Sequence, residues 1–216
     1  MIQLKKGILI AIEGIDGSGK SSLAQALLQQ LQNELSVLIT KEPGSTALGK
    51  HLRTLVQEKK VAINPKAEFL LFAADRAQHF QEIIIPALAE KKLIISDRMA
   101  DSSLVYQGYG RGLDKTIISL INNWVMEGIT PDLTFYIKVD VQIGKQRILQ
   151  RNAALSSFEK ETDAFLEKLI EGFSSLYMNR SDVIIIDGNQ EQEKVTKAAY
   201  SKLKNWLKEN NRLCNQ

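Results

Sequence analysis

The stretch from Ile8 to Ser21 reads ILIAIEGIDGSGKS, an apolar run followed directly by a glycine-rich loop. Positions 14 to 21 match the pattern G-x-x-x-x-G-K-[ST] at every fixed position. In such a loop the glycines let backbone N–H groups surround a phosphate, Lys20 places a cation beside the outer phosphates, and the Ser21 hydroxyl can ligate Mg²⁺. The stretch predicts a nucleoside triphosphate site formed by Gly14, Ile15, Asp16, Gly17, Ser18, Gly19, Lys20 and Ser21.

Apolar runs alternate with amphipathic segments along the rest of the chain. The runs at 8–12, 37–40, 93–96, 134–139 and 182–186 are typical of strands that helices cover on both faces. A helix is expected to begin at Pro65, a break or kink is expected at Pro86, and a last helix is expected from about 191 to 207. We therefore expect an α/β protein with the three-layer P-loop NTPase fold, a five-stranded parallel sheet covered by helices on both faces.

Length and composition limit the class of protein further. The 216 residues favour a single domain, 1–216. The net charge of +3 is too small to indicate a nucleic-acid partner, although it suits an anionic substrate. The single cysteine, Cys214, provides no disulfide framework, so a cytoplasmic location is expected. We expect no membrane span, because no apolar stretch approaches the roughly 20 residues that a span needs. We expect no signal sequence, because Glu13 interrupts the first apolar run.

Four further stretches lie between the phosphate loop and the middle of the chain. They are Glu42–Gly44 (EPG), Phe69–His79 (FLLFAADRAQH), Asp97–Arg98, and Ser102–Gly112 (SSLVYQGYGRG). Their order and spacing resemble the thymidylate kinase family, and the resemblance covers nearly the whole chain. It implies an enzyme that uses ATP and Mg²⁺ to phosphorylate dTMP, giving dTDP and ADP. It also implies a homodimer formed through the helix around residues 69–79.

Asp97 and Arg98 follow a buried strand, so both side chains are expected at the carboxyl edge of the sheet, where α/β proteins bind ligands. Asp97 can hold Mg²⁺ through water, and Arg98 can bridge the donor and acceptor phosphates. A structural ion pair is the alternative interpretation. The resemblance implies that Asp16 organises magnesium and the acceptor sugar; an ordinary loop residue is the alternative there.

The resemblance also implies how the acceptor base is bound. Phe72 and Arg76 lie four residues apart on one helical face, and they correspond to the ring that stacks on thymine and to a hydrogen-bond donor to the base. Ser103 and Gln107 correspond to the pair that reads the thymine edge, and Tyr106 to the residue that crowds the 2′ position of the sugar. Without the resemblance, Phe72 would be a core aromatic, and Ser103 and Tyr106 would face solvent.

The acceptor phosphate is assigned in the same way. Arg53 corresponds to the arginine that grips the monophosphate, with a solvated helix arginine as the alternative. Glu42 and Pro43 are expected in a tight turn under the acceptor pocket. Lys41 stands where the family usually has arginine, and Met99 stands where it prefers an aromatic residue or histidine.

The sequence departs from the family pattern in the lid, expected around 147–160. Family members place a catalytic arginine either in the phosphate loop, where this chain has Gly17, or in the lid, where residues 152–159 (NAALSSFE) contain none. Arg147 and Arg151 lie four residues apart on one helical face. We expect Arg151, with Arg147 behind it, to supply the missing charge; the alternative is that both are surface arginines.

Other functions stay open at this stage. One is a kinase for dUMP or for a deoxynucleoside. Another is a catalytically weakened P-loop binding module, which the sparse lid favours. A P-loop ATPase that uses nucleotide as a switch would have no use for the acceptor-site motifs.

Overall fold

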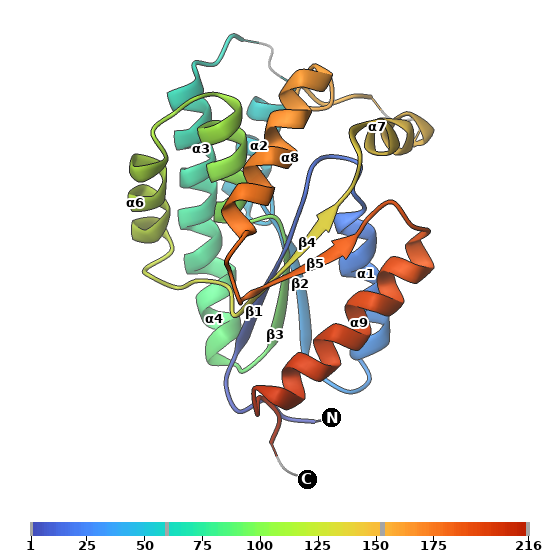
Figure 1. Ribbon diagram of the computed structural model, residues 1–216. Helices are drawn as coiled ribbons and strands as arrows, with labels where there is room; N and C mark the ends of the chain where they lie inside the picture. The colour runs from blue at the N-terminus through green and yellow to red at the C-terminus, as the bar shows by residue number, and fades with distance from the viewer. Residues whose placement is uncertain (1, 59–60, 152–153, 215–216) are drawn as a thin grey trace.

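The computed structural model describes residues 2–58, 61–151 and 154–214. At its centre lies one sheet of five parallel strands in the order β2-β3-β1-β4-β5 (Figure 1). The strands are β1 (Ile8–Glu13), β2 (Val37–Lys41), β3 (Leu93–Asp97), β4 (Leu133–Lys138) and β5 (Val183–Asp187). All five predicted strands are therefore confirmed, each within one residue of its expected bounds.

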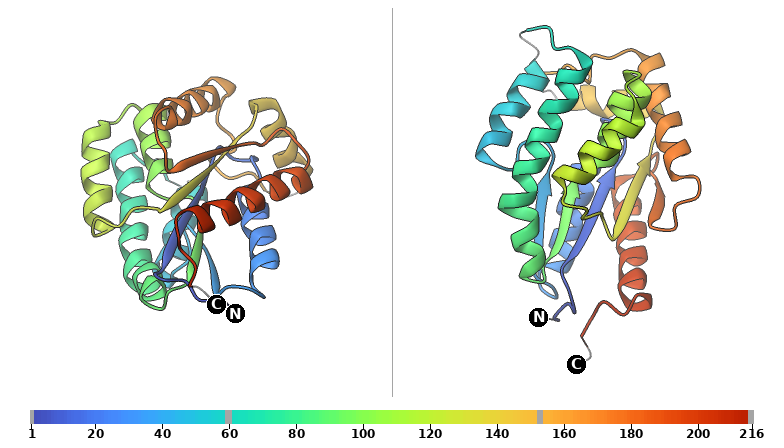
Figure 2. Two further views of the ribbon diagram at one scale, coloured as in Figure 1. Left: turned by 60° about the horizontal axis from the view of Figure 1, so that its bottom comes forward. Right: turned by 90° about the vertical axis from the view of Figure 1, so that its left-hand side faces the viewer.

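Helices cover both faces of the sheet, which confirms the predicted fold class (Figures 1 and 2). On one face, α1 (Lys20–Leu31) and α9 (Gln192–Glu209) pack against the strands through a single buried apolar cluster. On the other face lie α3 (Pro65–His79), α4 (Ile85–Ala89) and α8 (Asp163–Tyr177), with α6 (Lys115–Val125) packed against α3. Three further helices follow the carboxyl ends of β2, β3 and β4: α2 (Ala47–Glu58), α5 (Ala100–Ser103) and α7 (Val141–Gln150).

Two helices continue into π-helical turns. α3 begins at Pro65 as expected and runs through the wide turn η1 (Phe80–Ile84) into α4, so the chain stays helical past Pro86. The Ile85 N–H donates to the carbonyl oxygen of Phe80, five residues back, directly before the proline that has no N–H of its own. The expected irregularity at Pro86 is therefore a wide turn before the proline rather than an end of the helix. In the same way, α5 continues into η2 (Leu104–Gly110).

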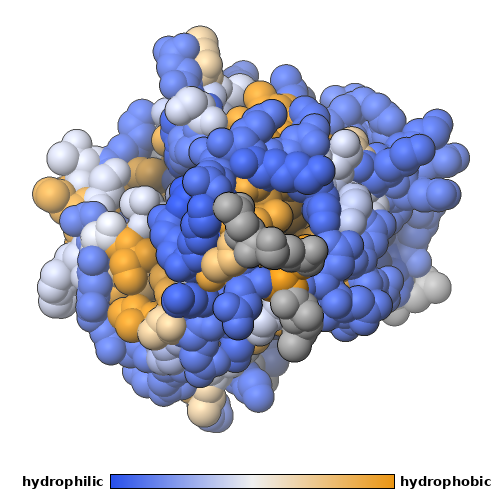
Figure 3. Space-filling model, turned by 90° about the horizontal axis from the view of Figure 1, so that it is seen from below, coloured by the Kyte–Doolittle hydropathy of each residue, from blue (hydrophilic) through white to orange (hydrophobic). Residues whose placement is uncertain are grey.

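The two ends of the described chain meet at the amino edge of the sheet, where Leu4 and Leu213 form an antiparallel bridge. The surface on this side is mostly hydrophilic, with apolar side chains in separate patches (Figure 3). Within the described ranges, no helix combines the length and the apolar character that a bilayer crossing requires. The carboxyl edge, where the predicted motifs gather, lies at the opposite end of the molecule.

Candidate active site

The phosphate loop connects β1 to α1 at the carboxyl edge of the sheet. Lys20 is buried, and its Nζ donates to the carbonyl oxygen of Ile15 at 2.7 Å. Burial, and next the positive charge of Arg98, lower the pKa of Lys20 to about 8. An anion bound between these two cations would favour the charged lysine, as expected for a phosphate site. The cavity above the loop, here the donor cavity, is lined by Gly17, Gly19, Lys20, Ser21, Asp97, Arg98, Arg147, Arg151 and Gln192, among others.

The proposed metal ligands lie together at one wall of the donor cavity. The Ser21 hydroxyl donates a hydrogen bond to Asp97 Oδ2. Mg²⁺ prefers oxygen ligands and usually takes one or two from the protein, with phosphates and waters supplying the rest. A hydroxyl beside one carboxylate fits this chemistry, and the described residues contain no larger cluster of acidic, histidine or cysteine side chains that would indicate another metal.

Gly17 explains why this chain has no arginine in its phosphate loop. Its φ is +78°, and a Cβ there would lie 2.1 Å from the carbonyl oxygen of Gly144 in α7. Both the backbone conformation and the contact exclude a side chain, because the loop packs directly on the backbone of α7. Any cation in addition to Lys20 must therefore come from outside the loop.

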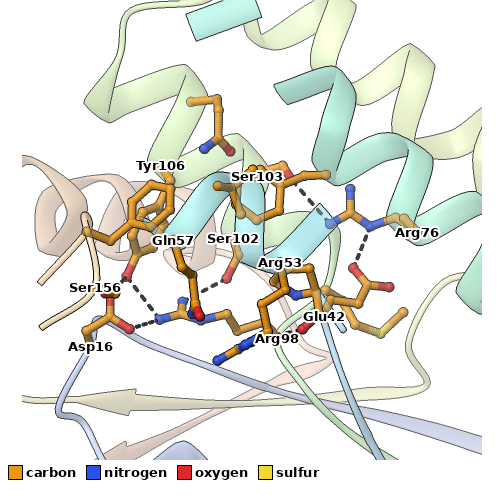
Figure 4. Close-up of a pocket in the computed structure, with 16 residues that line it drawn as sticks. Asp16, Glu42, Arg53, Gln57, Arg76, Arg98, Ser102, Ser103, Tyr106 and Ser156 are labelled. Carbon is orange, nitrogen blue, oxygen red and sulfur yellow. Dashed lines mark hydrogen bonds and ion pairs between the residues drawn. The ribbon is translucent and has the colours of Figure 1, made fainter. Parts of the chain in front are cut away.

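Arg98 occupies the centre of the site (Figure 4). Its Nη2 donates to Asp16 Oδ1 at 2.5 Å and to the Tyr106 hydroxyl at 3.2 Å, and its Nη1 donates to the Ser102 hydroxyl at 3.2 Å. Burial alone would raise the pKa of Asp16, but Arg98 and Lys20 together hold that pKa below its usual range. Asp16 is thus a charged group bonded to Arg98 and, at 3.1 Å, to the Tyr106 hydroxyl, rather than an ordinary loop residue.

A second cavity, here the acceptor cavity, adjoins the donor cavity. Asp16, Arg53 and Arg98 line both. The expected acceptor residues are all brought together around it: Asp16, Glu42, Pro43, Arg53, Phe72, Arg76, Arg98, Ser103, Tyr106 and Gln107. Two ligands bound in these cavities would meet at Arg98.

Three aromatic rings form the apolar part of the acceptor cavity. Phe158 has its ring centroid 5.9 Å from that of Phe72 and 5.9 Å from that of Tyr106. Phe72 is half-buried and faces the cavity, so it is not a plain core residue. The sequence prediction missed Phe158, because this ring lies in the expected lid around 147–160, where only the arginines were considered.

Arg76 is held in a buried network beside the cavity. Its Nε donates to Glu42 Oε2 at 2.8 Å, and its other nitrogens donate to the Asn122 side-chain oxygen at 2.7 Å and to the Ser103 hydroxyl at 3.2 Å. Glu42 also contacts the ring of His79 at 2.9 Å. Burial would raise the pKa of Glu42, but Arg76 and His79 hold it below its usual range. Glu42 therefore lines the cavity as the ionised partner that fixes Arg76.

Three of the expected acceptor residues, Ser103, Tyr106 and Gln107, are buried rather than solvent-facing. Ser103, Tyr106 and Gln107 all lie within the buried part of α5–η2 and line the cavity. The Gln107 Nε2 donates to Glu68 Oε1 at 3.0 Å, which fixes the orientation of the amide. The wide turn η2 brings Tyr106 and Gln107 to the same cavity, a geometry that helical spacing alone did not predict.

Arg53 lies across the turn after β2. Its Nη1 donates to the carbonyl oxygen of Pro43 at 2.9 Å. Gly44 has a φ of +113°, and a Cβ there would lie 2.9 Å from Arg53 Cδ. The glycine of the EPG stretch therefore leaves room for the arginine to reach the junction of the two cavities. Met99 is buried in an apolar cluster and also lines the acceptor cavity.

The two lid arginines make different contacts. Arg147, in α7, donates to the carbonyl oxygens of Gly188 and Gln190 at 2.7 and 2.9 Å. Arg151 is exposed, pairs with Glu159 and lines the donor cavity. Residues 152 and 153 of the expected lid lie outside the described residues. Arg147 is thus bonded to the loop at 188–190, whereas Arg151 lies at the wall of the donor cavity.

The sheet is parallel and carries a phosphate loop at its carboxyl edge, next to a second cavity with aromatic and charged walls. These features define a P-loop nucleotide-binding protein with a second ligand site.

Comparisons with known proteins identify the family within this class. A sequence profile described as Thymidylate kinase matches residues 12–199. The protein named Thymidylate kinase from Halothermothrix orenii is 40% identical over 205 residues, 94% of this chain and 99% of that protein. The one from Trichormus variabilis is 41% identical over 207 residues, 94% of this chain and 98% of that protein. The crystal structure of thymidylate kinase from Ehrlichia chaffeensis matches with a TM-score of 0.75 and 31% identity, covering 92% of this chain and 99% of that one. The chain belongs to the thymidylate kinase family.

Proposed function

We propose that this chain is a magnesium-dependent kinase that transfers the γ-phosphoryl group of ATP to dTMP, giving dTDP and ADP. The observation that carries the proposal is that Arg98 borders both the donor and the acceptor cavity. Two anions that must react repel one another, and a planar guanidinium between them lowers that repulsion while it aligns both groups.

The transfer needs no general base, because the attacking phosphate oxygen of dTMP is already anionic near neutral pH. Catalysis is therefore positioning and charge neutralisation. Lys20 and the loop amides hold the donor phosphates, Arg53 holds the acceptor phosphate, and Arg98 spans the two. Asp16 fixes Arg98 and faces the acceptor sugar. Arg151 and Arg147 supply lid charge, and closure of the lid excludes water that would otherwise accept the phosphoryl group.

Ser21 and Asp97 would hold the magnesium ion, Asp97 through a water molecule. When bound, the ion neutralises charge on the donor phosphates.

The acceptor cavity suits a thymine nucleotide. Phe72 offers a ring for stacking, Arg76 and Ser103 offer polar atoms, and the Gln107 amide can both donate and accept. Tyr106 lies against Asp16 and Arg98, where its ring crowds the 2′ position of a sugar. These features favour a pyrimidine deoxynucleotide over a purine.

We also propose that the protein is a homodimer formed through α3 and α6. These helices lie side by side on one flank (Figure 2). They expose Leu70, Ile117, Leu120 and Trp124, the last with 78% of its surface in solvent. Exposed apolar residues gathered on adjacent helices favour burial against a second chain. The cytoplasm remains the proposed location, on the basis of the single cysteine.

The test is ADP release from ATP and Mg²⁺ with a panel of nucleoside monophosphates as acceptors. We expect turnover that depends on dTMP and is weaker with dUMP. Equal turnover without any acceptor would indicate a switch ATPase. Nucleotide binding without turnover would indicate a binding module, and a preference for dUMP would indicate the other pyrimidine kinase.

A further inference from the structure

Glu13 is a buried carboxylate for which the mechanism above has no role. It is the last residue of β1, directly before the phosphate loop, and it is 0% exposed. Its Oε1 accepts hydrogen bonds from the backbone N–H groups of Met99 at 2.8 Å and Ser102 at 3.3 Å, and its Oε2 accepts from the Ser102 hydroxyl at 2.5 Å. A carboxylate held away from water needs such partners. Glu13 therefore ties the end of β1 to the start of helix α5–η2.

Ser102 connects this carboxylate to Arg98. The Ser102 hydroxyl has a single proton, which it donates to Glu13 Oε2. Its oxygen is then left to accept from Arg98 Nη1, at 3.2 Å. The same Nη1 donates to the carbonyl oxygen of Gly14, the neighbour of Glu13, at 3.1 Å. The carboxylate thus fixes the direction of two hydrogen bonds in series that end on the guanidinium.

The backbone of Arg98 also depends on these contacts. Its φ is +73°, in the left-handed region that a non-glycine residue adopts only when its surroundings hold it there. Glu13 bonds the N–H of Met99, the next residue, and both the N–H and the hydroxyl of Ser102. The chain is therefore fixed immediately after Arg98, and the guanidinium is fixed at Nη1 by Ser102 and at Nη2 by Asp16.

We propose that Glu13 is a positioning residue for phosphoryl transfer that acts on Arg98 through Ser102. The inference rests on the proposed function, since it assumes that Arg98 bridges two phosphates. Among the described residues that line the two cavities, Ser102 and Arg98 are present and Glu13 is not. Its effect on the reaction must therefore pass through its neighbours.

Steady-state kinetics of Glu13→Gln and Ser102→Ala provide the test. A glutamine amide would donate to the Ser102 oxygen and compete with Arg98, so we expect kcat to fall roughly ten- to hundredfold. For Glu13→Gln the KM for dTMP should change by less than about threefold, because Glu13 lines neither cavity. Since both residues belong to one series of bonds, the double variant should be no slower than the slower single variant. Ser102→Thr, which keeps the hydroxyl, should restore most of the activity.

The pH dependence of kcat provides a second measurement, one that a purely structural role of Glu13 would not change. Burial, followed by the negative charge of Asp101, raises the pKa of Glu13 to about 7, against the opposing effects of the Ser102 hydroxyl and Arg98. Lys20 is a further charged group near it. Protonated Glu13 resembles glutamine, so the ratio of wild-type to Glu13→Gln kcat should fall as the pH decreases from about 8 to about 6. Titration of the substrate is common to both proteins and cancels in this ratio.

Asp132→Asn is the matched control. Asp132 Oδ2 accepts from the backbone N–H of Leu9 at 3.1 Å, at the other end of the same strand and far from both cavities. This variant should lose stability but keep its kcat.

The inference would be overturned, with wild type still phosphorylating dTMP, by any of three results. These are an unchanged kcat in Glu13→Gln and Ser102→Ala, effects confined to KM, or additive losses of kcat in the double variant. A wild-type protein inactive on dTMP would instead refute the proposed function, and the inference with it. If Glu13→Gln does not fold, the comparison of Ser102→Ala with Ser102→Thr decides.

Discussion

Arg98 is the single residue on which the proposed mechanism depends most. It has a left-handed backbone, donates hydrogen bonds to Asp16, Ser102 and Tyr106, and borders both cavities. Four bonds from its Nη1 and Nη2 atoms hold the guanidinium in one orientation at the junction of the two cavities, where its charge lies between the sites proposed for the two phosphates. Its substitution therefore tests the bridging role directly.

Arg98→Ala should lower kcat by about 10²- to 10³-fold, the size of effect seen when one preorganised donor to a transition state is removed. Arg98→Lys keeps the charge but loses the planar fork, so at least about tenfold of the loss should remain. Steady-state kinetics with saturating ATP and dTMP measure both. A lysine variant as fast as wild type would mean that only charge is needed, and would contradict a bidentate bridge.

Asp75 leads to an expectation about stability and pH. It is buried next to Glu42, with Oδ1 bonded to the Gly44 N–H at 3.0 Å and Oδ2 without a partner among the described residues. Burial, and next the charge of Glu42, raise its pKa from the usual 3.8 to about 6. The folded protein therefore binds this proton more tightly than the unfolded chain does. The stability that the proton contributes is present below about pH 4 and is lost as the pH rises through about 6.

Asp75→Asn removes this titration. Relative to wild type, the free energy of unfolding of the variant should improve by up to about 3 kcal/mol as the pH rises from about 4 to about 7, at about 1.4 kcal/mol per pKa unit. Urea unfolding of both proteins across this pH range measures the difference in the free energy of unfolding. The titration of the other groups is common to both proteins and cancels in this difference. A difference that stays constant with pH would show that Asp75 does not titrate in this way.

Local sequence identified many of these residues but not their partners. Arg98 and Asp97 could be placed at the carboxyl edge because they directly follow an apolar strand. Glu13 was read only as a polar interruption of the first strand, yet it is fully buried. Its partners, Met99 and Ser102, lie more than 80 residues away in the chain. No local pattern contains that pairing, because the parallel register of β1 and β3 creates it.

Elements of secondary structure were predictable where the hydrophobic pattern was strong. The strands are short apolar runs between polar segments, and α3 begins at a proline preceded by an asparagine whose side chain caps the helix. The π-helical turns η1 and η2 were not predictable, because each is a short segment within a continuous helix and π-helical turns are rare. The η2 turn matters most, since it sets the positions of Tyr106 and Gln107.

Arg147 in the lid helix α7 and Arg151 directly after that helix make different contacts, so we expect different effects from their substitution. Arg151 pairs with Glu159 and lines the donor cavity. We expect it to exchange Glu159 for the bound phosphates, so Arg151→Ala should lower kcat by more than about tenfold. Arg147 holds the carbonyl oxygens of Gly188 and Gln190, so Arg147→Ala should mainly raise the KM for ATP. Initial rates over a range of ATP concentrations distinguish the two effects. A change in kcat below about tenfold would remove Arg151 from the catalytic residues.

At the scale of the whole molecule, α3 and α6 leave an apolar flank uncovered, with Leu70, Ile117, Leu120 and Trp124 exposed. If a second chain covers it, wild-type protein should sediment as a dimer of two 24.2 kDa chains. Trp124→Glu should then give a monomer, because a charge in a packed apolar interface is costly. Met178→Glu is the control, since Met178 is similarly exposed, at 74%, but lies after α8. A wild-type monomer, or an equal effect of both substitutions, would contradict this assembly.

The arrangement of two cavities at one edge of the sheet is tested most directly by following the labelled γ-phosphate of ATP. Purified protein is incubated with γ-³²P-ATP, Mg²⁺ and dTMP, and the labelled products are separated. We expect the label to appear in dTDP, with little inorganic phosphate, because Arg98 aligns the two substrates and the lid excludes water. Label released as inorganic phosphate whether or not dTMP is present, or label that stays in ATP, would contradict direct transfer between the two cavities.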